Sequence, residues 1–145
     1  MPQVSKRILS KEVEEKMFET LWEALSQLRR REDIQLFLDD FLTPVERIML
    51  AKRLAIAVLL LKGANYEGIR DFLKVSNDPI SRVQLAIKHK KGYRVAIDKL
   101  IRTEAGREFW RDIASLIHRL GVTSDTFVDE KLVRRKLGIK KKTLI

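Results

Sequence analysis

The sequence predicts an all-α protein, and three observations support this class. Apolar residues recur at spacings of three and four along most of the 145-residue chain, as they do on the buried face of a helix. Glycine (6 residues) and proline (3 residues) are too scarce for the many tight turns of an all-β protein. Good helix-capping residues also stand directly before several of the apolar segments. The length fits about one domain of ~100–200 residues.

Two helices are expected in the first 43 residues. The first covers residues 11–30, with Ser10 as its N-cap and an apolar stripe from Val13 to Leu28. The second is short and runs from about Asp33 to Phe41.

The sequence 43–46, Thr-Pro-Val-Glu, is the clearest local signal. Thr43 and Glu46 form a capping box, and Pro44 suits the first helical position. The helix should end near Lys62, because Gly63 suits a left-handed C-terminal cap. Residues 54–61 are apolar in every direction, which predicts burial on all sides. The covering helices come either from a second copy in an interleaved dimer or from the same monomer.

Two short helices at residues 65–88 fit a helix-turn-helix. The first is expected over residues 65–73 with Asn65 as its cap. The second is expected over residues 79–88, with Asp78 as its cap and Pro79 in its first turn. A connection of about four residues between two such helices is typical of the motif. Further helices are expected over residues 93–101 and 104–120, the latter capped by Thr103.

The positive charge is concentrated in two segments. The whole chain has a net charge of +10, yet residues 44–94 alone carry +7, and residues 131–145 carry seven basic groups and no acidic group. Residues 1–43 and 95–130 are each at −2. Localised positive charge favours a polyanionic partner, most commonly a nucleic acid; the alternative is a solvated surface that aids solubility.

Several classes of function are excluded or disfavoured by composition. The absence of cysteine excludes a disulfide scaffold, a thiol nucleophile and a Cys-ligated zinc. The chain has two histidines and no phosphate-binding glycine loop or nucleophile motif, so no enzyme activity, metal or cofactor is expected. No apolar run approaches the ~20 residues of a membrane span, and no signal segment is evident. A cytoplasmic protein is therefore expected.

The residues also resemble a known family. Residues 42–47 (Leu-Thr-Pro-Val-Glu-Arg), followed by Leu50, Arg53, Ile56, Leu60 and Gly63, resemble the central segment of the bacterial tryptophan repressor. Residues 79–82 (Pro-Ile-Ser-Arg) with Lys88 resemble its DNA-reading helix. Residues 92–94 (Gly-Tyr-Arg) are more similar to a sister branch of poorly characterised tryptophan-repressor-related proteins. The resemblance spans roughly residues 15–103.

The resemblance implies an interleaved homodimer in which each copy presents a helix-turn-helix to double-stranded DNA. The two reading helices would lie about one DNA turn, ~34 Å, apart on a roughly palindromic site. It places base contacts at Asn77, Asp78 and Ser81. Asp78 has two open alternatives, base reader or helix cap. Arg82 should contact phosphate or pair with an acidic neighbour. Other phosphate or groove contacts are expected at Arg70, Lys88, Lys90 and Lys91.

The resemblance also implies an effector pocket at Thr43, Arg53 and Arg82. Two small residues of that pocket are replaced here by Val83 and Ala86. A branched side chain at position 83 should block an indole ring, so tryptophan is not expected as a ligand.

The sequence therefore predicts a homodimeric, sequence-specific, repressor-like transcriptional regulator. Three parts are expected: a DNA-binding domain over residues 1–103, an added helix and loop over residues 104–130, and a basic tail over residues 131–145. The tail should add phosphate contacts through Arg134, Arg135, Lys136, Lys140, Lys141 and Lys142. The alternatives are an accessory protein that binds structured RNA and a helical protein–protein adaptor.

Overall fold

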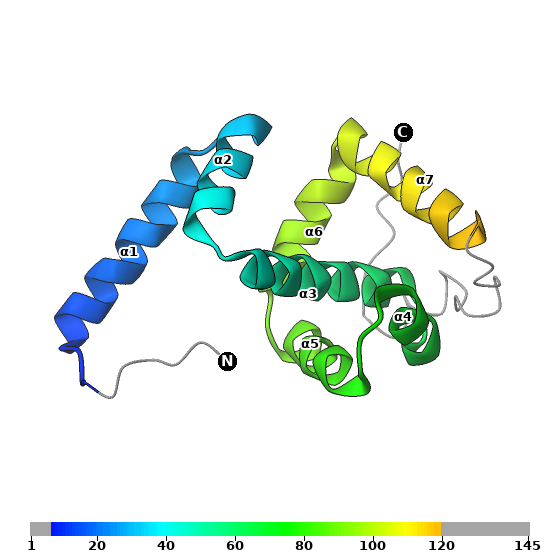
Figure 1. Cartoon of the computed structure of the whole chain (residues 1–145), viewed down its shortest axis with the longest axis horizontal. Helices are drawn as coiled ribbons and strands as arrows, with labels where there is room; N and C mark the ends of the chain where they lie inside the picture. The colour runs from blue at the N-terminus through cyan, green and yellow to red at the C-terminus, as the bar shows by residue number, and fades with distance from the viewer. Residues whose placement is uncertain (1–6, 120–145) are drawn as a thin grey trace. The chain divides into compact units, whose positions relative to one another are not determined.

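The computed structural model describes residues 7–119, and this part of the chain is all-α, as the sequence predicts. Its helices follow one another with short connections (Figure 1). They are α1 (Lys11–Gln27), α2 (Arg31–Phe41), α3 (Pro44–Lys62), α4 (Tyr66–Leu73), α5 (Asn77–His89), α6 (Gly92–Arg102) and α7 (Glu104–Arg119). None of the helices within residues 7–119 is long and apolar enough to cross a membrane. The predicted loop after α7 and the basic tail lie outside the described residues.

The chain divides into two compact units, the first ending at Arg47 and the second beginning at Ile48. The first unit contains α1 and α2, and neither helix has a buried residue. Large apolar side chains are instead exposed there, among them Phe18 (48%) and Trp22 (59%), whose rings stack on each other. Over its described residues, 7–47, the first unit therefore has apolar surface but no core of its own.

Both helices of the first unit differ slightly from the predicted boundaries. The Ser10 side chain caps α1 by accepting from the Val13 amide, as predicted. The helix ends at Gln27, however, because the backbone of Leu28 is already extended (ψ 104°). The apolar spacing continues through Leu28 after the helix has stopped, and this made the predicted helix too long. α2 begins at Arg31, two residues earlier than predicted.

The core of the second unit surrounds the second half of α3. Four consecutive residues, Ile56 to Leu59, are at most 5% exposed. They pack with buried residues of the loop after α3 and of α4, α5 and α6, namely Ala64, Ile69, Ile80, Val83, Ile87 and Ile97. Figure 1 shows these helices gathered around α3. Burial in all directions is thus confirmed for residues 56–59, whereas Leu54 remains 44% exposed.

Both ends of α3 form as the sequence predicts. The Glu46 carboxylate accepts from the Thr43 amide (2.8 Å), and Thr43 Oγ accepts from the Glu46 amide (3.3 Å), which completes the capping box. The hydrogen bonds from Thr43 stabilise the carboxylate and lower the pKa of Glu46. Gly63 ends the helix with a φ of 92°, a left-handed conformation that glycine adopts without strain.

α6 and α7 meet at a close approach that only glycine permits. Thr103 caps α7 as predicted, its hydroxyl accepting from the Gly106 amide at 2.9 Å. A Cβ at position 106 would lie 1.7 Å from the Leu100 carbonyl oxygen. The packing of α7 against α6 therefore depends on the missing side chain of Gly106.

We predict that Gly106→Ala lowers the free energy of unfolding by about 1–3 kcal/mol, as overpacking against a backbone atom typically does. Hydrogen exchange should rise within residues 104–119, because α7 must shift away from α6. Gly92→Ala is the matched control, since a Cβ there meets nothing within 4 Å. Equal melting temperatures for the two variants would contradict the prediction.

Candidate nucleic-acid interface

The helix-turn-helix expected at residues 65–88 is present as α4, a three-residue turn and α5. Asn65 caps α4, with its side-chain oxygen accepting from the Gly68 amide at 2.8 Å. The turn then starts at Lys74, which closes α4 in a left-handed conformation (φ 54°, ψ 55°). The Val75 amide donates to the Arg70 carbonyl across this turn. Both helices lie within the second unit (Figure 1).

Apolar packing and one side-chain hydrogen bond orient α5 relative to α4. Ile80, Val83 and Ile87 of α5 are each less than 5% exposed and belong to the core around α3. The Tyr66 hydroxyl of α4 donates to the Gln84 side-chain carbonyl of α5. Because the core fixes one face of α5, the opposite face must point to solvent.

The outward face of α5 carries most of the predicted contact residues. On a helix of 3.6 residues per turn, Asp78, Arg82, Leu85 and His89 lie opposite the buried stripe, and all four are exposed. Ser81, half-buried, and Lys88, exposed, flank them. Two predicted base-contact residues, Asp78 and Ser81, therefore share one accessible surface, which we call the outward face of α5. The third, Asn77, is exposed at the first position of the helix.

Asp78 does not cap α5. The helix begins at Asn77, its N-cap is Ser76, and no side chain supplies a capping hydrogen bond. The cap alternative was wrong because Pro79 fits anywhere in the first turn, where amides have no helical partner. The Asp78 carboxylate instead pairs with Arg82 Nε at 3.0 Å. Its negative charge also interacts favourably with the positive, N-terminal end of the helix dipole. Arg82 thus has the acidic partner that the sequence suggested.

The remaining predicted cations border this face. Arg70 is exposed in the last turn of α4, and Lys88 is exposed in the last turn of α5. Lys90 is the C-cap of α5, and Lys91 is the N-cap of α6. The predicted tail contacts at residues 134–142 lie outside the described residues.

The three predicted effector residues are divided between the two units, with Arg53 and Arg82 in the second. Thr43 belongs to the first unit, and its hydroxyl is engaged with Glu46 as both donor and acceptor. Arg53 is exposed on α3, and Arg82 is paired with Asp78. Val83 is 4% exposed within the core. Within residues 7–119, no cluster of acidic or histidine side chains could hold a metal ion.

The structure adds two residues to this surface that the sequence did not single out. Lys74 is exposed in the turn between α4 and α5, and Leu85 is 57% exposed in the middle of the outward face. A spacing argument could have placed Leu85, since it lies seven residues after Asp78. No sequence pattern could have placed Lys74 on this surface, because its position depends on where α4 ends.

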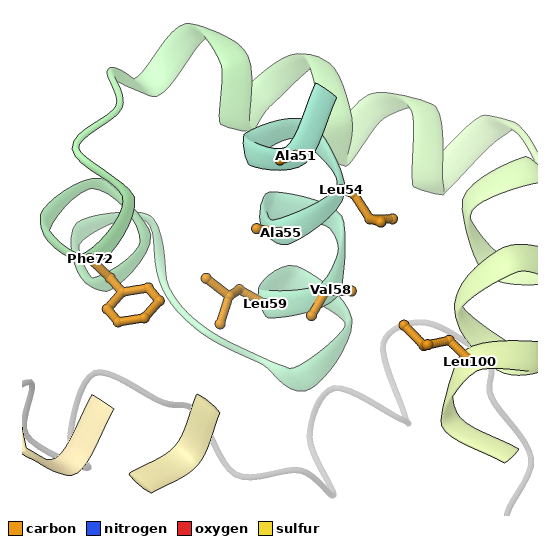
Figure 2. Close-up of a pocket in the computed structure, with 7 residues that line it drawn as sticks. All are labelled: Ala51, Leu54, Ala55, Val58, Leu59, Phe72 and Leu100. Carbon is orange, nitrogen blue, oxygen red and sulfur yellow. The ribbon is translucent and has the colours of Figure 1, made fainter. Parts of the chain in front are cut away.

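A second feature of this unit is an open apolar hollow of about 300 Å³. Figure 2 shows its lining side chains, which come from α3, α4 and α6. They are Ala51, Leu54, Ala55, Val58, Leu59, Phe72 and Leu100. Within the described part of the chain no charged residue lines it, so the hollow suits apolar side chains.

Comparison with known proteins identifies the family. A profile of the family described as Trp repressor protein matches residues 16–101, more than half of the chain. The chain belongs to the Trp repressor protein family. The crystal structure of a candidate Trp repressor from Staphylococcus aureus is similar to this chain, with a TM-score of 0.58 and 25% sequence identity. That match covers 65% of this chain and 95% of the other. A search of curated proteins gives no significant match.

Lys74 provides a direct test of the turn between α4 and α5. It is the one non-glycine residue with positive φ within residues 7–119, and a left-handed conformation costs an ordinary residue roughly 1–2 kcal/mol. Lys74→Gly should raise the free energy of unfolding by about 0.5–1 kcal/mol, because glycine loses part of that gain to its freer unfolded chain.

The matched control is Lys99→Gly, inside α6, where the same replacement should lower stability by up to about 1 kcal/mol. Urea denaturation of the two variants beside the parent measures both effects. A decrease in stability for Lys74→Gly would show that the turn does not hold this conformation.

Proposed function

We propose that this protein is a homodimeric, sequence-specific DNA-binding transcriptional regulator that acts like a repressor. The observation that carries the proposal is the outward face of α5, an accessible helix face with polar and charged side chains in a Trp repressor family fold. Such a helix fits the major groove of B-DNA. The family membership supports a DNA-binding regulator in general, and the finer assignments below are ours.

In this proposal, the start of α5 reads bases and the surrounding cations hold the backbone. Asn77 and Ser81 supply hydrogen-bonding groups for base edges. Asp78 and Arg82 enter as an ion pair, so the carboxylate does not meet phosphates uncompensated. Arg70, Lys74, Lys88, Lys90 and Lys91 supply sequence-independent phosphate contacts. Tryptophan is not the proposed effector, because Val83 fills the core at the position of a small pocket residue.

Selection of bound duplexes from a random pool tests the function as a whole. The proposal expects enrichment of a palindrome whose half-sites are about one helical turn apart. Retention of RNA in preference to duplex DNA would favour the accessory role on structured RNA. Failure to retain any nucleic acid would favour the adaptor role.

Lys88→Gln should weaken binding to selected and random duplexes by similar factors. The slope of log K against log salt should become shallower by about 0.9 for each phosphate that the protein no longer neutralises. Fluorescence anisotropy over a salt series measures this slope. Lys16→Gln is the control, because Lys16 lies on α1 and already pairs with Glu19 at 3.1 Å. A changed base preference in Lys88→Gln would assign Lys88 to base reading instead.

The dimer rests on apolar surface that the described chain leaves uncovered. α1 exposes Phe18 and Trp22, α2 exposes Phe41, and neither helix buries any residue. The apolar hollow of the second unit is also open. Apolar side chains that are exposed side by side are typical of an interaction site. A second copy supplies matching apolar helices, so each copy would cover the other.

Trp22→Glu should raise the dimer dissociation constant about 30-fold or more, because it removes an aromatic ring whose burial stabilises by about 2 kcal/mol and buries a charge instead. Sedimentation equilibrium measures the change. Gln27→Glu adds the same charge about 140° around α1 from Trp22, at an exposed position, and should leave the dimer intact. A compact parent monomer of 16.9 kDa would contradict the proposed assembly.

A further inference from the structure

The outward face of α5 has an apolar residue at its centre. Leu85 is 57% exposed, although the other large aliphatic residues of α5 are buried: Ile80 (0%), Val83 (4%) and Ile87 (3%). At 100° per residue, Leu85 lies roughly 140–160° around the helix from each of these three. It therefore cannot contribute to the core that they form.

The helical neighbours of Leu85 on this face are all polar. Arg82 precedes it by three residues and Ser81 by four, while Lys88 and His89 follow at three and four. Arg82 is already paired with Asp78 at 3.0 Å. Leu85 is thus the one apolar side chain among the outward residues 78, 81, 82, 85, 88 and 89, and it needs an apolar partner to leave water.

The major groove offers one apolar group at a base edge, the C5-methyl of thymine. We propose that Leu85 contacts this methyl group in each half-site and so selects thymine at one position of the operator. This inference rests on the proposed DNA-binding function and adds a specificity-determining residue to it. Leucine has no hydrogen-bonding group, so its preference must come from the methyl group alone.

The experiment replaces thymine by deoxyuridine, which removes only the C5-methyl group. Each thymine of a selected duplex is replaced in turn, symmetrically in both half-sites, and the dissociation constant is measured by anisotropy. One position should lose affinity by about fourfold per half-site, or about 16-fold for both, the value expected for one buried methyl group.

Leu85→Ala should abolish this discrimination, binding the thymine and uracil duplexes with a ratio close to 1. Alanine is the best helix former, so α5 should remain folded, and circular dichroism checks this. Val95→Ala is the matched control, because Val95 is a comparably exposed aliphatic residue (53%) on α6. It should keep the parental ratio.

Two results would overturn the inference while leaving the DNA-binding function intact. One is parental binding that is indifferent to uracil at every thymine. The other is a Leu85→Ala variant that retains the parental thymine preference. A variant that changes the sedimentation of the protein but not its thymine preference would count as this second result. Failure of the proposed DNA-binding function would give a different result, because no duplex would then be enriched from the random pool.

Discussion

The structure depends on the burial of α3 in every direction. Four successive residues of a helix point in four directions about 100° apart, and in α3 all four from Ile56 to Leu59 are covered. Each of the three helices that follow contributes at least one isoleucine that is no more than 1% exposed: Ile69, Ile80 and Ile97. Full burial of one such side chain stabilises by about 1.5–3 kcal/mol. α4, α5 and α6 are therefore held around α3 by what they bury.

This constraint also determines which side of α5 is accessible. Ile80, Val83 and Ile87 commit one face to the core, so the residues between them project outward without any further device. The Tyr66–Gln84 hydrogen bond links α5 to α4 at the flank of that face. Val83 is part of the same packing and is buried in the core. Its side chain therefore occupies space that the family resemblance would leave open beside a smaller residue.

Much of this arrangement could be predicted from the sequence, because helix starts have local chemistry. Ser10, Asn65 and Thr103 each cap the helix that the sequence assigned to them, and the Thr43–Glu46 capping box forms. The predicted start of α5 was wrong because proline fits any position in the first turn of a helix, so Pro79 does not identify the first helical residue. Ser76 supplies no side-chain hydrogen bond that would have marked the true start.

The candidate site was predictable in outline and less so in detail. The inward spacing of Ile80, Val83 and Ile87 identified the outward face, whereas a nucleic-acid partner, which the excess of basic residues predicts, stays a prediction. The conformation of Lys74 was not predictable, since a left-handed lysine is unfavourable by itself. The role of Asp78 also depended on geometry: a carboxylate in a first turn can cap, read a base or pair at i+4, and the observed distance to Arg82 shows the pairing.

In the proposed complex with DNA, charge and specificity are separated along α5. Its first turns hold an ion pair of no net charge, Asp78 with Arg82, whereas its last turn and the following link hold Lys88, His89, Lys90 and Lys91. Cations near the C-terminal end of a helix also interact favourably with the negative end of its dipole, so the lysines stabilise α5 even in the absence of DNA. Phosphate affinity can then change with the lysines while the pattern read by the first turns stays the same. In the same proposal, discrimination in the middle of the face belongs to Leu85, since the nearest charged side chain before it, Arg82, is already paired with Asp78.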